Sequence, residues 1–241
     1  MGGFSAVVFD LDGVLWDGEP LYREAVNVVL APYGHRLSDE EYAMIMGHSV
    51  EASWEWLRQR FQLTEPPAQL LRADSEAVLR LLEQSLQTLP GARPLIDELR
   101  RRAVPIAVAS ASLRHWVDAT LLGLGLQDTF DATVSASEVD NGKPAPDLFL
   151  EAARRLGVPP ERCLAVEDTA TGIAAAKAAG LFAVQVRAAS TALPPLPEAD
   201  TVIEDYSQFD LGLLSPCHSE QSEESVHRQE SRHGLTPRDT A

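Results

Sequence analysis

The sequence predicts an α/β protein: a Rossmann-like, doubly wound parallel sheet with an all-helical insertion after its first strand. Two observations favour this fold. After residue 90, short apolar runs typical of buried strands alternate with amphipathic helices, which implies right-handed crossovers and a parallel sheet covered on both faces. By contrast, residues 18–88 carry apolar side chains at three- and four-residue spacing and contain no convincing strand.

The strands and helices of the sheet domain can be placed in order. The first strand is expected at 6–9, and the others at 105–110, 132–136, 162–168, 182–186 and 201–203. Helices are expected at 90–102, 113–125, 145–157 and 171–180, the last of them stopped by Gly180. We therefore predict an α/β catalytic core of residues 1–17 and 89–215, with residues 18–88 as a helical domain.

The insertion is expected to hold helices at 21–34, 39–47, 50–61 and 69–89. Ser38 and Glu41 have the spacing of a capping box, and Pro66-Pro67 marks a break between helices. The segment 216–241 is rich in Ser, Glu, Gln, His and Arg. It has too few apolar residues to offset the entropy lost on ordering, so we expect a disordered tail.

Composition excludes several function classes. The chain has 36 acidic against 20 basic residues and a formal net charge of −16, which argues against nucleic acid or anionic membranes as partners. No run approaches the ~20 apolar residues of a membrane span. Cys163 and Cys217 form neither a disulfide framework nor a zinc motif, so we expect a cytoplasmic protein.

Chemically useful residues collect just beyond the ends of the expected strands. They are Asp10 and Asp12, Ser110-Ala111-Ser112, Gly142-Lys143-Pro144, and Glu167-Asp168. Because the carboxyl ends of parallel strands meet at one edge of a sheet, these groups should converge. Clustered carboxylates call for a cation, and hard oxygen ligands favour Mg²⁺ together with a substrate phosphate. Lys143 and Ser110 are then suited to bind phosphate oxygens.

Four motifs carry a family resemblance. FDLDGVL, VASAS, KPAP and VEDT, in this order, resemble the motifs of the haloacid dehalogenase superfamily of phosphohydrolases. The helical insertion resembles the cap of its phosphoglycolate phosphatase and β-phosphoglucomutase branch. The resemblance covers roughly residues 4–190 and implies an aspartate-based phosphoryl transfer.

The resemblance assigns the catalytic roles to the first motif. Asp10 would be the nucleophile that forms an aspartyl-phosphate. Asp12 would be the acid/base that protonates the leaving oxygen and then activates water. The alternative for both residues is a simple turn, because Asp and Gly are common turn formers.

The other three motifs would hold the phosphate and the metal. Ser110, Ala111 and Lys143 would bind the phosphoryl group. Mg²⁺ would be bound by Asp10, Asp12 (through its backbone carbonyl) and Asp168, with Glu167 as an outer or supporting ligand.

Simpler roles for these residues remain open from the sequence alone. Lys143 would otherwise be a surface lysine between turn residues, and Ser110 would end a strand or cap a helix. Ser112 is expected to cap the following helix rather than to bind a ligand.

Substrate choice is expected to lie in the cap. Residues 46–56 occupy the place of the family's specificity loop, so His48, Ser49 and Trp54 are candidates, together with Arg114 after the second motif. The alternatives are an exposed loop for His48, cap core for Trp54 and an ordinary helix start for Arg114.

Some positions depart from the family pattern. Gly18 stands where a hydroxyl residue is usual, and we expect it to loosen the hinge between core and cap. Val50 and Tyr22 stand where the mutases have an arginine and a histidine. These two changes favour hydrolysis over mutase chemistry.

We therefore predict a Mg²⁺-dependent phosphatase of a small phosphorylated metabolite: a sugar phosphate, glycerol phosphate or phosphoglycolate. The competing hypotheses are a β-phosphoglucomutase-like sugar phosphomutase and a non-catalytic phosphometabolite-binding protein. Dehalogenation is disfavoured because Asp12 is present. We expect a monomer or weak dimer, and the sequence does not identify the substrate.

Overall fold

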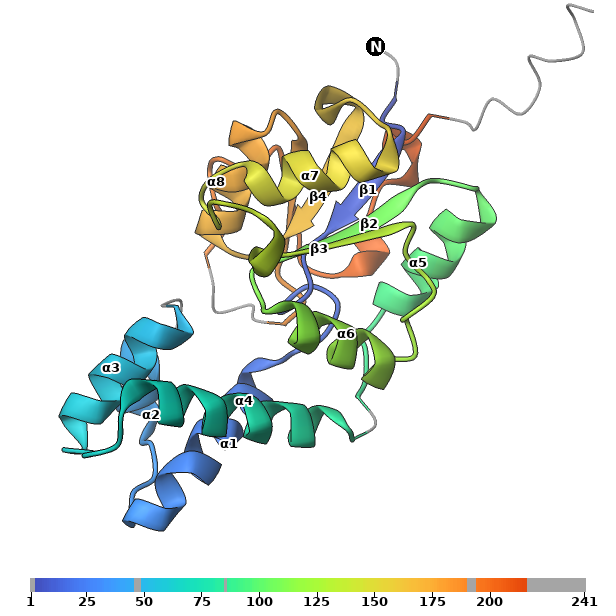
Figure 1. The fold of residues 1–241 in the computed structure, drawn as a ribbon. Helices are drawn as coiled ribbons and strands as arrows, with labels where there is room; N and C mark the ends of the chain where they lie inside the picture. Colours follow the sequence, from blue (N-terminus) through green and yellow to red (C-terminus); the bar gives the residue numbers. More distant parts are fainter. Residues whose placement is uncertain (1–2, 46–48, 85, 190–193, 216–241) are drawn as a thin grey trace, which may run out of the picture.

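Six parallel strands form the centre of the computed structural model (Figure 1), which describes residues 3–45, 49–84, 86–189 and 194–215. The strand order is β3-β2-β1-β4-β5-β6, so the chain winds outward from β1 first on one side and then on the other. The strand bounds are β1 Ala6–Phe9, β2 Ile106–Ser110, β3 Ala132–Ser135, β4 Cys163–Glu167, β5 Phe182–Val186 and β6 Thr201–Ile203. The predicted doubly wound sheet is confirmed.

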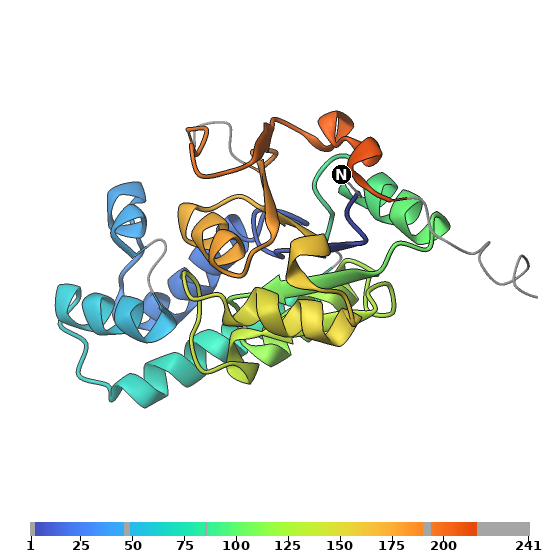
Figure 2. The same cartoon turned by 90° about the horizontal axis from the view of Figure 1, so that it is seen from above.

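Helices cover both faces of this sheet. Helices α7 and α8 lie on one face, and α5 and α6 lie on the other (Figures 1 and 2). The helix bounds are α1 Glu19–Leu30, α2 Asp39–Ile45, α3 Val50–Arg60, α4 Pro67–Leu82, α5 Ala92–Arg101, α6 Arg114–Gly123, α7 Asp147–Leu156 and α8 Ala170–Ala178. Short 3₁₀ helices lie at η1 Ala31–Tyr33, η2 Ala136–Glu138, η3 Pro160–Arg162, η4 Tyr206–Gln208 and η5 Leu211–Leu213.

The core is divided by the sheet into two apolar layers. On β1, Ala6 and Val8 point into the layer beneath α7 and α8, whereas Val7 and Phe9 point into the opposite layer. All four residues are fully buried. The strand therefore reads as a continuous apolar run, which is what two covered faces require.

The insertion between β1 and β2 is helical wherever the structure describes it. Helices α1 to α4 lie to one side of the sheet (Figure 1), and α1 packs along α4. The chain enters and leaves this unit at neighbouring points, because the Leu89 N–H donates to the Leu15 carbonyl at 2.8 Å. The predicted capping box is present: the Glu41 N–H donates to Ser38 Oγ, and the Ser38 N–H donates to Glu41 Oε2, both at 3.1 Å.

Two differences from the predicted bounds lie next to proline, whereas α4 ends at Leu82, seven residues before the predicted end. Strand β2 begins at Ile106 and not at Pro105, because proline has no N–H for the strand ladder. Helix α7 begins at Asp147, directly after Pro146. His48, Cys217 and the expected tail at 216–241 lie outside the described residues. Within the described ranges, no helix is long and apolar enough to cross a membrane.

Candidate active site

Lys143 joins the ends of two neighbouring strands. Its ammonium forms an ion pair with Asp10, which lies just after β1. A second ion pair joins it to Oε1 of Glu167, the last residue of β4, at 2.6 Å. All three side chains are at most 9% exposed. Burial favours the neutral amine, but the two carboxylates outweigh it and raise the pKa of Lys143. The lysine is therefore charged and is not a surface residue.

Glu167 is held by its own loop as well as by Lys143. Its Oε2 accepts from the Asp168 N–H at 2.7 Å, the Thr169 N–H at 2.8 Å and the Thr169 hydroxyl at 3.0 Å. Thr169 is also the N-cap of α8. These contacts satisfy Glu167 within the chain and suit it to hold Lys143 in position.

Asp168 is the carboxylate with an unused oxygen. Its Oδ1 is buried without a hydrogen-bond partner in the described chain. Burial and the charges of Glu167 and Asp10 raise the pKa of Asp168. Gly13 allows this close approach, since it has a φ of +78° and a Cβ there would lie 2.2 Å from Asp168 Oδ2.

The three carboxylates form a site that fits a divalent cation. Oxygens of Asp10, Glu167 and Asp168 lie within 4.8 Å of one another. Three carboxylates beside one ammonium leave two negative charges uncompensated. Burial raises the pKa of Asp10, with further contributions from Glu167 and Asp12 that Lys143 opposes. A cation bound by hard oxygen ligands would relieve this repulsion.

Asp12 is held apart from that cluster by three donors. Its Oδ1 accepts from Tyr22 Oη at 2.8 Å and Trp16 Nε1 at 3.0 Å, and its Oδ2 accepts from Ser112 Oγ at 2.9 Å. Burial raises the pKa of Asp12, and the hydrogen bonds from Tyr22, Ser112 and Trp16 oppose the rise. Two aspartates two residues apart thus have different environments.

The structure corrects one expectation near Asp12. Ser112 does not cap the next helix, because α6 begins at Arg114 after Leu113, which makes no side-chain cap bond. Gly18 has helical torsion angles, and a Cβ there would lie 2.7 Å from the Tyr22 ring and 2.8 Å from Asp12 Oδ1. Glycine is therefore needed there for space, and its effect on the hinge stays a prediction.

The predicted phosphate-binding residues lie at the same sheet edge. Ser110 ends β2 and is fully buried, and its Oγ accepts from the Ser112 N–H at 3.1 Å. Ala111 is the exposed residue between them. Their roles toward phosphate stay predictions, as does that of Lys143.

The structure places the described candidates for substrate choice at three different positions. Ser49 is exposed and caps α3, because its Oγ accepts from the Ala52 N–H at 3.2 Å. Arg114 pairs with Asp118 at 2.7 Å and Glu138 at 3.1 Å, both on the core domain. Trp54 is 1% exposed and packs in the apolar core of the cap, and its role in substrate choice stays a prediction.

A cavity of about 170 Å³ lies between cap and core, and Trp54 lines it. The core contributes Ser112 and Trp116, and α1 contributes Tyr22, which stacks on Trp116 at a ring-centroid distance of 5.7 Å. The cavity therefore adjoins the donors of Asp12. The sequence pattern does not reveal this role of Tyr22 and Ser112, although Tyr22 departs from the family pattern.

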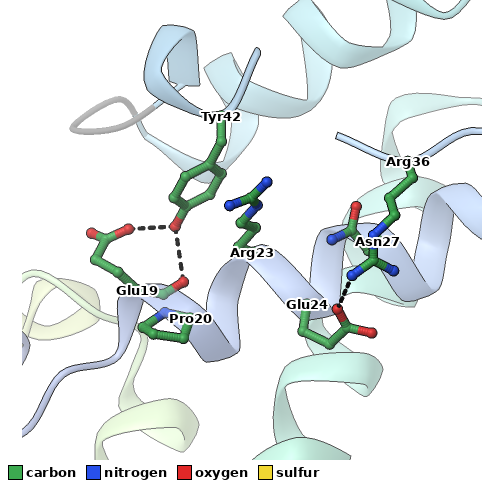
Figure 3. A pocket seen from close by; sticks show the side chains of 7 residues that line it. All are labelled: Glu19, Pro20, Arg23, Glu24, Asn27, Arg36 and Tyr42. Carbon is green, nitrogen blue, oxygen red and sulfur yellow. Dashed lines mark hydrogen bonds and ion pairs between the residues drawn. The ribbon is translucent and has the colours of Figure 1, made fainter. Parts of the chain in front are cut away.

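A second cavity is lined by residues of α1, α2 and the segment between them (Figure 3). Its charged side chains pair with one another or with close neighbours: Arg36 with Glu24 at 3.0 Å, and Arg23 with Asp39 at 2.5 Å. The Tyr42 hydroxyl donates to the Glu19 carboxylate and lies 3.2 Å from the Glu19 carbonyl (Figure 3). This cavity has none of the strand-end residues.

Comparison with known proteins identifies the family of the chain. A sequence model of the haloacid dehalogenase-like hydrolases matches residues 4–180. The chain belongs to this family. Both the predicted family and the hydrolase class are thereby confirmed.

Relatives within the family include sugar phosphatases. The chain is 37% identical over 188 residues to the fructose-1-phosphate phosphatase YqaB of Escherichia coli, covering 76% of this chain and 97% of that protein. The crystal structure of CbbY from Rhodobacter sphaeroides with xylulose-1,5-bisphosphate matches with a TM-score of 0.77 and 28% identity, over 88% of this chain and 99% of CbbY. A putative β-phosphoglucomutase from Thermotoga maritima matches with a TM-score of 0.73 and 28% identity, over 84% and 95% of the two chains.

The packing of Gly172 against Glu167 gives a first prediction. A Cβ at Gly172 would lie 1.7 Å from Glu167 Oε1, so Gly172→Ala must push that carboxylate away from Lys143. We expect a loss of about 1–3 kcal/mol in the free energy of unfolding and a strong loss of activity, measured by urea denaturation and phosphate release.

Gly142→Ala is the matched control. Gly142 adjoins Lys143 in sequence, and a Cβ there would have no atom within 4 Å. This substitution should change the free energy of unfolding by less than about 0.5 kcal/mol. If Gly172→Ala and Gly142→Ala had the same free energy of unfolding and the same rate of phosphate release, the described packing of Glu167 would be contradicted.

Proposed function

We propose that this hydrolase releases phosphate from a small phosphorylated metabolite by way of a phosphorylated Asp10. The observation that carries the proposal is the buried ion pair of Lys143 with Asp10 and Glu167, next to a separately held Asp12. The sugar phosphatase among the relatives supports a sugar phosphate as the substrate class.

In the first step, an Asp10 carboxylate oxygen forms a bond to phosphorus while the bond to the substrate oxygen breaks. The Lys143 ammonium stabilises ionised Asp10 and faces the negative oxygens of the transferring group. Protonated Asp12 gives its proton to the departing oxygen, which leaves as a hydroxyl. Burial of Asp12 favours the protonated form that this step needs.

In the second step, water attacks the aspartyl-phosphate. Asp12, now ionised, accepts a proton from that water while phosphate leaves and Asp10 is regenerated. A carboxylate nucleophile thus divides one difficult displacement into two easier steps. The donors from Tyr22, Trp16 and Ser112 stabilise Asp12 in its ionised form between the steps.

Mg²⁺ is the cation that we propose for the acidic cluster. Asp10 and Asp168 would hold it, together with the Asp12 backbone carbonyl. Glu167, whose oxygens already accept from Lys143 and the Thr169 loop, would support the site from behind. When bound, Mg²⁺ supplies positive charge that neutralises phosphate oxygens.

The competing functions have less support. A sugar phosphomutase needs a cation for a second phosphate, and Val50, where the mutases have an arginine, lines the cavity between cap and core. A non-catalytic binding protein would need neither Asp10 nor the three donors that hold Asp12. Cytoplasmic localisation and a monomer or weak dimer stay part of this proposal.

Replacement of Asp10 tests the nucleophile. Asp10→Asn keeps the shape of the side chain and removes its nucleophilic charge, so we expect at least ~10³-fold slower phosphate release from p-nitrophenyl phosphate with Mg²⁺. Asp17→Asn, at an exposed acid in the same loop, serves as the control and should keep nearly full activity. Unchanged turnover in Asp10→Asn would contradict the mechanism.

The hydrogen bond from Tyr22 predicts a change in pH dependence. Tyr22→Phe removes a donor that stabilises ionised Asp12, so it raises the pKa of Asp12. If protonated Asp12 is the acid, the alkaline limb of kcat must move to higher pH. Fructose 1-phosphate is the proper substrate for this measurement, because its alkoxide needs protonation far more than p-nitrophenolate does.

Tyr33→Phe, elsewhere in the cap, is the control for the pH profile. Tyr33 lies in η1 and does not line the cavity beside Asp12. Its profile should match that of the unmodified protein. A limb that stays in place or moves to lower pH in Tyr22→Phe would argue against Asp12 as the acid.

A further inference from the structure

A buried carboxylate of the cap takes no part in the reaction proposed above. Asp74, on α4, is 4% exposed. Its Oδ1 makes no hydrogen bond to any part of the chain that the structure describes. Burial raises the pKa of Asp74 to about 6, and a hydrogen bond from the Trp54 side chain opposes the rise. One oxygen of Asp74 is therefore free to accept a hydrogen bond.

Asp74 lines the same cavity as two of the three donors of Asp12. Tyr22 and Ser112 bound this cavity on the catalytic side, and Asp74 and Trp54 bound it on the cap side. A substrate whose phosphate lies at the strand ends would thus extend its remainder toward Asp74. The end of the cavity at Tyr22 and Ser112 adjoins the reacting groups, whereas the end at Asp74 and Trp54 would contact the rest of the substrate.

The other acid of the cavity already has a partner. Glu19 accepts from the Tyr42 hydroxyl, which also reaches the Glu19 carbonyl (Figure 3). Asp74 has no comparable donor beyond Trp54. Of the two acids, Asp74 is therefore the one with capacity left for a ligand.

The charge of the cavity selects against a second anion. Its lining, taken over the described residues, includes Glu19 and Asp74 but no lysine, arginine or histidine. Val50 and Val78 add apolar surface. A second phosphate or a carboxylate would be desolvated beside two acids, and the described lining residues supply no cation to compensate it, which is strongly unfavourable.

We propose that Asp74 is a specificity-determining residue that accepts a hydrogen bond from a substrate hydroxyl, so that the enzyme selects monophosphates whose remainder is neutral and hydroxyl-bearing. The inference rests on the proposed phosphatase function and deepens it. It excludes bisphosphates and phosphorylated carboxylic acids such as phosphoglycolate from the preferred substrates. The aromatic side chains of the lining, Tyr22, Trp54 and Trp116, provide flat apolar surface against which the C–H groups of a sugar or polyol can pack.

Fructose 1-phosphate and fructose 1,6-bisphosphate form the matched pair of probes, because they differ only in the second phosphate. With Mg²⁺, kcat/KM should be at least about tenfold higher for the monophosphate. Asp74→Asn removes the charge and keeps the shape, so the ratio should fall toward one. Preference of the unmodified protein for the bisphosphate, phosphoglycolate or phosphoethanolamine would overturn the substrate class.

Asp74→Leu tests the hydrogen bond itself. A hydrogen bond to a charged acceptor corresponds to about tenfold to a hundredfold in affinity. We expect kcat/KM for fructose 1-phosphate to fall by that factor relative to kcat/KM for p-nitrophenyl phosphate, which has no hydroxyl for Asp74. Glu76→Gln, at an exposed acid on the same helix, should leave the ratio unchanged. A parallel loss on both substrates in Asp74→Leu would overturn the proposal.

A binding measurement tests the role of Asp74 independently of the proposed phosphatase activity. If no substrate releases phosphate, the proposed function fails, and calorimetry of fructose 1-phosphate with Mg²⁺ still decides the role of Asp74. The dissociation constant should rise about tenfold or more in Asp74→Leu and stay constant in Glu76→Gln. Equal affinity in the unmodified protein and Asp74→Leu would contradict the assignment.

Discussion

The ion pair of Lys143 with Asp10 and Glu167 is the interaction on which the site depends. It joins the loop after β3 to the ends of β1 and β4, which are adjacent strands of the sheet. Removing one partner from such a buried pair leaves an uncompensated charge and typically costs about 3–5 kcal/mol. Glu167 is fixed in turn by Thr169, and Gly172 leaves the space for it. The lysine is thus held where it contacts Asp10, the proposed nucleophile, and faces the proposed phosphate position.

Different partners give the two neighbouring aspartates different roles. Asp10 faces an ammonium and two other carboxylates, whereas Asp12 faces a phenol, an indole and a hydroxyl. The first environment suits an ionised nucleophile beside a cation, and the second suits a group that gains and loses a proton. Because Tyr22 belongs to α1, the hydrogen bonding of Asp12, the proposed proton donor, depends on the position of the cap.

Much of the fold could be predicted from the sequence, and the reason is physical. Both faces of the sheet are covered, so each strand reads as an apolar run, and the residues after it identify the edge where ligands bind. Asp10, Lys143, Glu167 and Asp168 were found in this way. The convergence of Asp10 with Glu167 and Asp168 follows from the adjacency of β1 and β4, whereas Lys143 reaches them through the loop after β3.

Contacts between distant segments could not be predicted in the same way. Ser112 reaches Asp12 across 100 residues, and no local pattern distinguishes that hydroxyl from a helix cap. Asp74 lies on a helix whose period was predicted, but its burial depends on how α4 packs against α1 and α6. The periodicity of one helix does not reveal which polar residue will line a cavity between two domains.

The central claim is that the phosphoryl group passes through Asp10. Acid quenching of a single turnover of fructose 1-phosphate with Mg²⁺, followed by mass spectrometry of the proteolysed chain, tests it most directly. We expect a transient phosphoryl group on the peptide that contains Asp10, appearing before free phosphate and absent in Asp10→Asn. Release of phosphate with no phosphorylated Asp10 at any time, or with the phosphoryl group on Ser110, would contradict the account.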